Sequence, residues 1–181
     1  MAKLPTVNWN QTSGQHLTLI GNSKYLRLTG GQQYRIRIVS SPYRFFKIFR
    51  RIGGRVLTAI TDTKTGVNLP DGTIPTERYA LYILDRADGK IKLLEAPLSI
   101  VRSIANHAEV TGCNPTDPDH GSDYVIKVDG TGMNTRYSVT PLMETPLTDA
   151  DKNAVKITSE DPLHILYKGH TPEQIQERLL L

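Results

Sequence analysis

The stretch YRFFKIFRRIGGR, residues 43–55, combines all three phenylalanines of the chain with five basic side chains and contains no acid. At the two-residue period of a strand, one face alternates aromatic rings with cations, and Phe46 and Ile48 form the apolar centre of the other. The first face holds Phe45, Lys47, Phe49 and Arg51. This alternation suits single-stranded nucleic acid, because bases stack on the rings while the cations hold phosphates. An amphipathic core strand whose charged ends reach water would show the same pattern.

Other kinds of chemistry have little support in the sequence. The chain has one cysteine, Cys113, so it can form neither an internal disulfide nor a zinc site with several thiolates. Its five histidines are scattered, and it has no phosphate-binding loop motif. Asp117, Asp119 and Asp123 could suggest calcium, but the closing Glu of an EF-hand loop is missing, which favours a turn. We therefore predict no catalytic residue, cofactor or metal, and do not expect an enzyme.

Charge is distributed unevenly along the chain. The first 60 residues contain ten lysines and arginines and no Asp or Glu, which gives this segment +10. The total is +4, so the remaining residues carry −6. Uncompensated cations favour a polyanionic partner for the first third. Alternatively, the two parts neutralise each other in the fold.

The N-terminus, MAKLPTVNWNQ, lacks the apolar core of a signal peptide, and no window of the sequence is as apolar as a membrane span. An intracellular protein is therefore expected. Hydrophobic residues make up 38% of the chain and charged residues 22%, as in an ordinary globular protein. The length of 181 residues fits one domain with a core, with or without additional arms.

Short strands separated by turn residues dominate the sequence pattern. Strands are predicted at residues 34–40, 43–52, 55–61, 79–85, 90–95, 123–128 and 135–140. Apolar spacing predicts a central helix at 99–110, which Gly112 ends. Thr171, Pro172 and Gln174 predict the start of a short C-terminal helix with a capping box. These elements indicate a mainly β fold, a small OB-type barrel with one central and one C-terminal helix.

Three regions are expected: an N-terminal arm at 1–23, the OB-type nucleic-acid-binding domain at 24–147, and a C-terminal extension at 148–181 that carries the short helix. Ile175, Leu179 and Leu180 form an apolar stripe on that helix. The stripe would dock on the protein's own barrel or, alternatively, on a protein partner.

The order of several segments resembles a known family. Tyr-Arg-Ile-Arg-Ile at 34–38, FFKIFRRIGGR, ERYALYILDRADGKIKLLEAP and GCNPTDPDHGSDYVIKVDGTGMNTRYSVTPL follow one another as in phage single-stranded-DNA-binding proteins of the T-even helix-destabilising type. The similarity covers roughly residues 34–147. It implies an OB-fold that coats single-stranded DNA in replication, recombination and repair in the host cytoplasm. It also implies phage replication or recombination proteins as partners, and self-association on DNA.

The chain departs from this family in three places. Residues 61–76 correspond to the family's zinc subdomain but contain no cysteine or histidine, so we expect no zinc. The chain ends in Glu-Arg-Leu-Leu-Leu where the family has an acidic tail. The basic N-terminal motif that the family uses for cooperative binding has no counterpart here.

The charge pattern, the strand faces and the resemblance together predict a DNA-binding surface. Its expected residues are Arg35, Arg37, Tyr43, Phe45, Lys47, Phe49, Arg50, Arg51, Arg55, Tyr82, Arg136 and Tyr137. Arg136 enters through the resemblance alone, and the tyrosines could instead be core or edge residues. Two other functions stay open, an RNA-binding OB protein and a structural or assembly protein of a virion that contacts nucleic acid.

Overall fold

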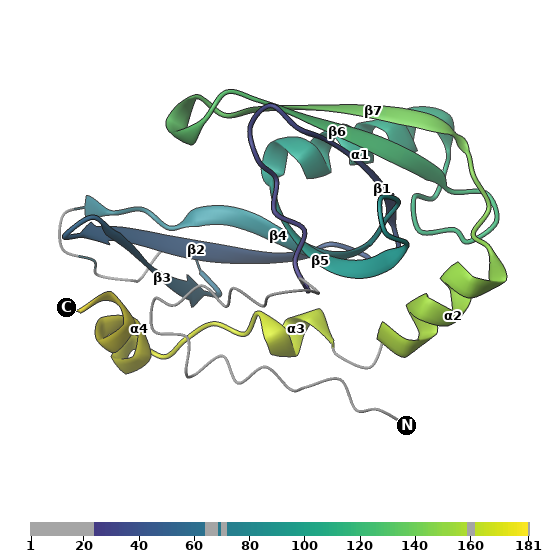
Figure 1. The fold of residues 1–181 in the computed structure, drawn as a ribbon. Helices are drawn as coiled ribbons and strands as arrows, with labels where there is room; N and C mark the ends of the chain where they lie inside the picture. The colour runs from purple at the N-terminus through teal and green to yellow at the C-terminus, as the bar shows by residue number, and fades with distance from the viewer. Residues whose placement is uncertain (1–23, 64–68, 70–71, 159–161, 181) are drawn as a thin grey trace.

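A single antiparallel sheet forms the body of the molecule (Figure 1). The computed structural model describes residues 24–63, 69, 72–158 and 162–180. The predicted N-terminal arm lies outside them, as do residues 64–68, 70 and 71 of the segment 61–76. The seven strands of the sheet are β1 (Gln33–Ile38), β2 (Tyr43–Ile52), β3 (Arg55–Thr61), β4 (Thr76–Asp85), β5 (Lys90–Pro97), β6 (Ser122–Asp129) and β7 (Arg136–Glu144).

Strand β4 organises the sheet because it pairs along both edges. One edge pairs with β5 from Arg78 to Asp85. The other pairs with β2 over its first half and with β1 over its second half. Beyond β2 lies β3, and beyond β1 lie β6 and β7, which gives the order β3-β2-β4-β1-β6-β7. The β2-β3 hairpin, which turns at Gly53 and Gly54 between the two predicted strands, thus lies at the opposite end of the strand order from β7.

One face of the sheet packs against helix α1 (Leu98–Thr111) and is called the α1 face. Its core contains Leu81 and Ile83 of β4, Leu94 of β5, and Ile100 and Ile104 of α1. The two helix residues are one turn apart, which places both on the side that faces the sheet. Gly112 ends α1 in the left-handed conformation with φ 70°, as its position after the last apolar turn predicts.

The other face, called the α3 face, packs against α3 and the residue that follows it. The extension contains α2 (Asp149–Thr158), α3 (Leu163–Leu166) and α4 (Pro172–Leu179), so the expectation of one short helix was too low. Tyr167, which follows α3, is fully buried against this face. Helix α4 begins with the predicted capping box, but it lies on the opposite side of the β2-β3 hairpin from Tyr167. Its Ile175 and Leu179 are buried together with Ile48 and Ala59, which point away from the α3 face. Two residues of the apolar stripe therefore dock on the protein's own sheet.

The predicted class, a mainly β fold with a central helix and a short C-terminal helix, is confirmed. The strand pairing does not return from β7 to β3 within the described residues, so the sheet is open rather than a closed barrel. Within the same residues, the helices fall short of the length and apolarity that crossing a membrane requires.

Candidate nucleic-acid interface

Arg35 and Arg37 point from β1 to the α3 face, but both side chains are engaged within the protein. Arg37 is 0% exposed, and its guanidinium donates to the backbone oxygens of Gly121, Thr145 and Asp117. Arg35 remains more accessible, with Nε and Nη2 each 2.9 Å from Asp123 Oδ2. The assignment of Arg37 to DNA is wrong, because the loop at 114–121 and the segment after β7 enclose its side chain.

Phe45, predicted to be a stacking platform, is a core residue. It is 1% exposed, and its ring centroid lies 4.6 Å from that of Tyr167. Tyr82, on the same face, is also buried in this cluster, and Tyr43 packs partly buried against it. The assignments of Phe45 and Tyr82 to DNA are therefore wrong, because the C-terminal extension covers the middle of this face. Phe46, at 8% exposed, is buried as predicted.

Lys47 marks the border between the covered and the open part of the α3 face. Its ammonium donates to Glu95 Oε2 at 2.6 Å, and the Tyr167 hydroxyl donates to the other carboxylate oxygen at 3.3 Å. Burial and, secondarily, the charge of Glu95 raise the pKa of Tyr167 well above its usual value. The same two causes raise the pKa of Tyr25. Both phenols therefore stay protonated at neutral pH, and Glu95 is the acid that compensates Lys47.

Beyond Lys47, no described residue buries the α3 face over the β2-β3 hairpin and the start of β4, where the side chains are exposed or half-buried. We call this area the Phe49 patch. It consists of Lys47, Phe49, Arg51, Val56, Thr58 and Arg78. Phe49 is 39% exposed, with Lys47 Nζ 5.8 Å and Arg78 Cζ 5.9 Å from its ring centroid. Across the hairpin, Thr58 stands opposite Phe49, and the exposed Val56 stands opposite Arg51. No ion pair within the described residues engages Arg51 or Arg78.

The sequence analysis missed Arg78, although its position could have been inferred. Arg78 stands opposite Phe45 in the pairing of β2 with β4, so both side chains point to the α3 face. The predicted strand began at residue 79, whereas β4 begins at Thr76. Pairing the strand 43–52 with a longer β4 would have placed Arg78 beside the phenylalanines.

The other predicted residues lie outside the Phe49 patch. Arg50 points to the opposite face, where its Nη1 donates to the backbone oxygens of Leu179 and Leu180 at the end of α4. Arg50 therefore anchors the extension. Arg55 is exposed beside the hairpin turn. Arg136 is exposed on β7, and Tyr137 packs partly buried against the α1-face core.

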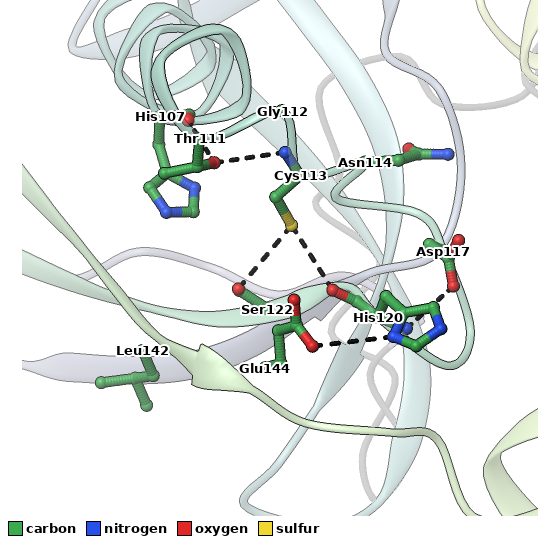
Figure 2. Close-up of a pocket in the computed structure, with 10 residues that line it drawn as sticks. All are labelled: His107, Thr111, Gly112, Cys113, Asn114, Asp117, His120, Ser122, Leu142 and Glu144. Carbon is green, nitrogen blue, oxygen red and sulfur yellow. Dashed lines mark hydrogen bonds and ion pairs between the residues drawn. The ribbon is translucent and has the colours of Figure 1, made fainter.

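A polar pocket of about 420 Å³ lies at the C-terminal end of α1 (Figure 2). The Cys113 thiol donates to the His120 backbone oxygen at 3.5 Å and lies 3.8 Å from Ser122 Oγ. His107 Nδ1 lies 3.1 Å from the Tyr124 hydroxyl, and His120 Nδ1 lies 3.6 Å from Glu144 Oε2. The thiol therefore contacts oxygens rather than an imidazole, which is not the arrangement of a cysteine nucleophile with its base.

The acidic loop beside this pocket has the geometry of a turn. Asp117 Oδ1 accepts from the backbone N–H groups of Asp119 and His120, both at 2.8 Å, and these bonds lower the pKa of Asp117. Asp123 is engaged by arginines. Across the described part of the chain, no three His, Cys, Asp or Glu residues gather as a metal would require.

Comparison with known proteins adds no relative. No protein-family model matches the chain, and a search of curated proteins returns no match.

Proposed function

We propose that the protein binds single-stranded DNA without strong sequence preference, and that the Phe49 patch is the contact surface. The main support is the exposed ring of Phe49, which lies beside Lys47 and Arg78, with Arg51 further along the same face. Every base has a face that can stack on such a ring, and the cations can take the phosphates on either side. The patch would therefore accept any sequence.

Single strands fit this surface better than duplex. In duplex DNA the bases stack on one another, so Phe49 could reach a base only after the helix opened, whereas the cations could contact phosphates in either form. A patch made of cations alone would give no such preference. The exposed ring is thus the feature that favours unpaired bases.

The resemblance to phage single-stranded-DNA-binding proteins supports the same proposal. On that basis, the protein would coat single-stranded DNA during replication, recombination and repair in the cytoplasm of an infected host cell. Proteins of those processes would be its partners, and copies could associate along the strand.

The test is fluorescence anisotropy with labelled single-stranded DNA, duplex DNA and RNA of equal length and matched sequence. We expect single-stranded DNA to bind most tightly and two unrelated sequences to bind alike. Equal or tighter binding of duplex would overturn the proposal. Preference for RNA would favour the RNA-binding alternative, and equal binding of single-stranded and duplex DNA would favour the structural alternative.

A further inference from the structure

The α1 face of the same strands carries a second group of cations. Arg44 of β2 stands directly opposite Tyr79 of β4, and its guanidinium carbon lies 5.8 Å from the ring centroid of the buried Phe46. Alternate side chains of a strand point to opposite faces, so Arg44 and Tyr79 lie across the sheet from Phe45 and Arg78. Only the thickness of one sheet separates this group from the Phe49 patch.

Helix α1 contributes a second arginine to this group. Arg102 is exposed on the second turn of α1, which packs on the same face. Burial and Glu77 raise the pKa of the Tyr79 phenol, while the charges of Arg44 and Arg102 act in the opposite direction. The geometry agrees, because Arg44 pairs with Tyr79 across the strands, and Tyr79 and Val101, the neighbour of Arg102 in α1, pack against the same core. We call Arg44, Arg102 and Tyr79 the Arg44 patch.

The Arg44 patch has an excess of positive charge. The acid beside it is Glu77, whose Oε1 accepts from the Tyr79 hydroxyl at 2.7 Å. No ion pair in the part of the chain that the structure describes engages Arg44 or Arg102. Two exposed arginines near one carboxylate favour an anionic ligand.

We infer that the Arg44 patch binds phosphates of the same DNA strand that occupies the Phe49 patch, so that the strand contacts both faces of the sheet. This inference rests on the proposed function. Phe46 is buried beneath Arg44, and Tyr79 is partly buried, so neither ring offers a base a free face. The second contact is therefore made by charge and is independent of sequence.

The inference requires the DNA strand to pass round the end of the sheet where β4 begins and β5 ends. Strand β4 begins at Thr76, which is exposed, and β5 ends at Pro97 opposite Arg78. From Arg78, a strand that passes round this end reaches Tyr79 and then Arg102. A short oligonucleotide on the Phe49 patch would not extend that far, whereas a longer one would. The Arg44 patch should therefore contribute only above a certain length.

The test compares Arg44→Gln/Arg102→Gln with the wild type on a series of thymidine oligonucleotides of increasing length, by anisotropy. On long oligonucleotides we expect the double variant to bind roughly tenfold more weakly and to show a smaller salt dependence. On the shortest ones that bind, its affinity should equal that of the wild type. Arg102→Gln alone should weaken binding to long oligonucleotides by part of this amount. Because Arg102 is exposed, this single variant should fold normally, and it tests the inference even if loss of Arg44 destabilises the fold.

Two further variants separate this inference from the proposed function. Lys127→Ala, which removes an exposed cation paired with Asp129 on β6, controls for general loss of charge and should bind normally at every length. Phe49→Ala should bind more weakly at every length. An unchanged affinity of the arginine variants on long oligonucleotides, or an equal loss at all lengths, overturns the inference. If Phe49→Ala binds normally, the proposed site itself is wrong.

Discussion

Phe45 and Phe49 lie on the same face of β2, yet only Phe49 meets solvent. Strand alternation correctly predicts that the two rings share a face, because that depends on the backbone alone. It cannot predict that Tyr167, more than a hundred residues later, packs on Phe45. What covers a face depends on contacts between distant segments, which the period of one strand does not encode.

This difference predicts opposite effects of the same substitution. Phe45→Ala should lower the free energy of unfolding by about 3 to 5 kcal/mol, because it leaves a cavity under Tyr167. Phe49→Ala should cost about 1 to 3 kcal/mol of binding to single-stranded DNA, because a stacking ring is lost, and should change stability little. Urea unfolding and anisotropy would measure both. Phe49→Trp, which keeps an aromatic face, should bind like the wild type; normal binding by Phe49→Ala would contradict the assignment.

Arg37 and Arg51 likewise differ in burial in a way that the sequence does not reveal. Arg37 and Arg51 both looked like phosphate contacts, but Arg37 is fully buried among backbone oxygens and Arg51 is exposed. A guanidinium can satisfy carbonyl groups of a loop as well as it satisfies phosphates. The partner is set by the loop at 114–121, whose path the local sequence does not reveal.

Elements with local signals were predicted well. The two-residue period and the turn glycines predicted the hairpins. Apolar spacing and Gly112 predicted α1, and the capping box at Thr171 predicted α4. Helix α2 was missed, although Thr148 and Asp151 exchange reciprocal hydrogen bonds at its start, a signal present in the sequence. Helix α3 spans four residues, too few to show a period.

His170, in the C-terminal extension, forms two hydrogen bonds with the outer edge of β3. Its backbone N–H donates to the Ile60 oxygen at 2.8 Å, and its Nδ1 accepts from the Ile60 N–H at 2.9 Å. The pKa of His170 is lowered to about 4, mainly by burial and further by Arg178, whereas Asp62 acts in the opposite direction. An imidazole that accepts from a backbone N–H must be unprotonated at that nitrogen.

Acid should therefore weaken this attachment. Above about pH 6.5, the usual pKa of histidine, His170 is neutral whether the chain is folded or unfolded, and its contribution to stability is complete. Between that pH and about 4, the unfolded chain binds a proton that the folded chain excludes, so stability falls as the pH falls. Urea unfolding from pH 7 to pH 4 would measure this. His170→Asn keeps an acceptor but cannot titrate, so its free energy of unfolding should fall less between pH 7 and pH 4 than that of the wild type. An equal fall would contradict the role of His170.

Across the whole molecule, ion pairs neutralise the positive charge of the first segment in one region and not in another. Asp123 engages Arg35 and Arg37, and Glu95 engages Lys47, so acids of the later segment compensate cations of the first. Arg51 and Arg55 of the hairpin have no ion pair among the described residues. Composition predicted the excess of positive charge, but only the strand order shows that it remains at the hairpin end of the sheet.

This distribution predicts unequal effects on the salt dependence of DNA binding. Each phosphate contact on a single strand contributes about 0.7 to the slope of log affinity against log salt, because it releases condensed counterions. Arg51→Ala and Arg78→Ala should each lower the slope by about this amount. Lys47→Ala should lower it by less, since a phosphate must displace Glu95 from the Lys47 ammonium and the freed carboxylate takes up cations in return. Anisotropy titrations at several salt concentrations would measure the slopes. If Lys47→Ala and Arg51→Ala lower the slope equally, Glu95 does not compete for Lys47 when DNA binds.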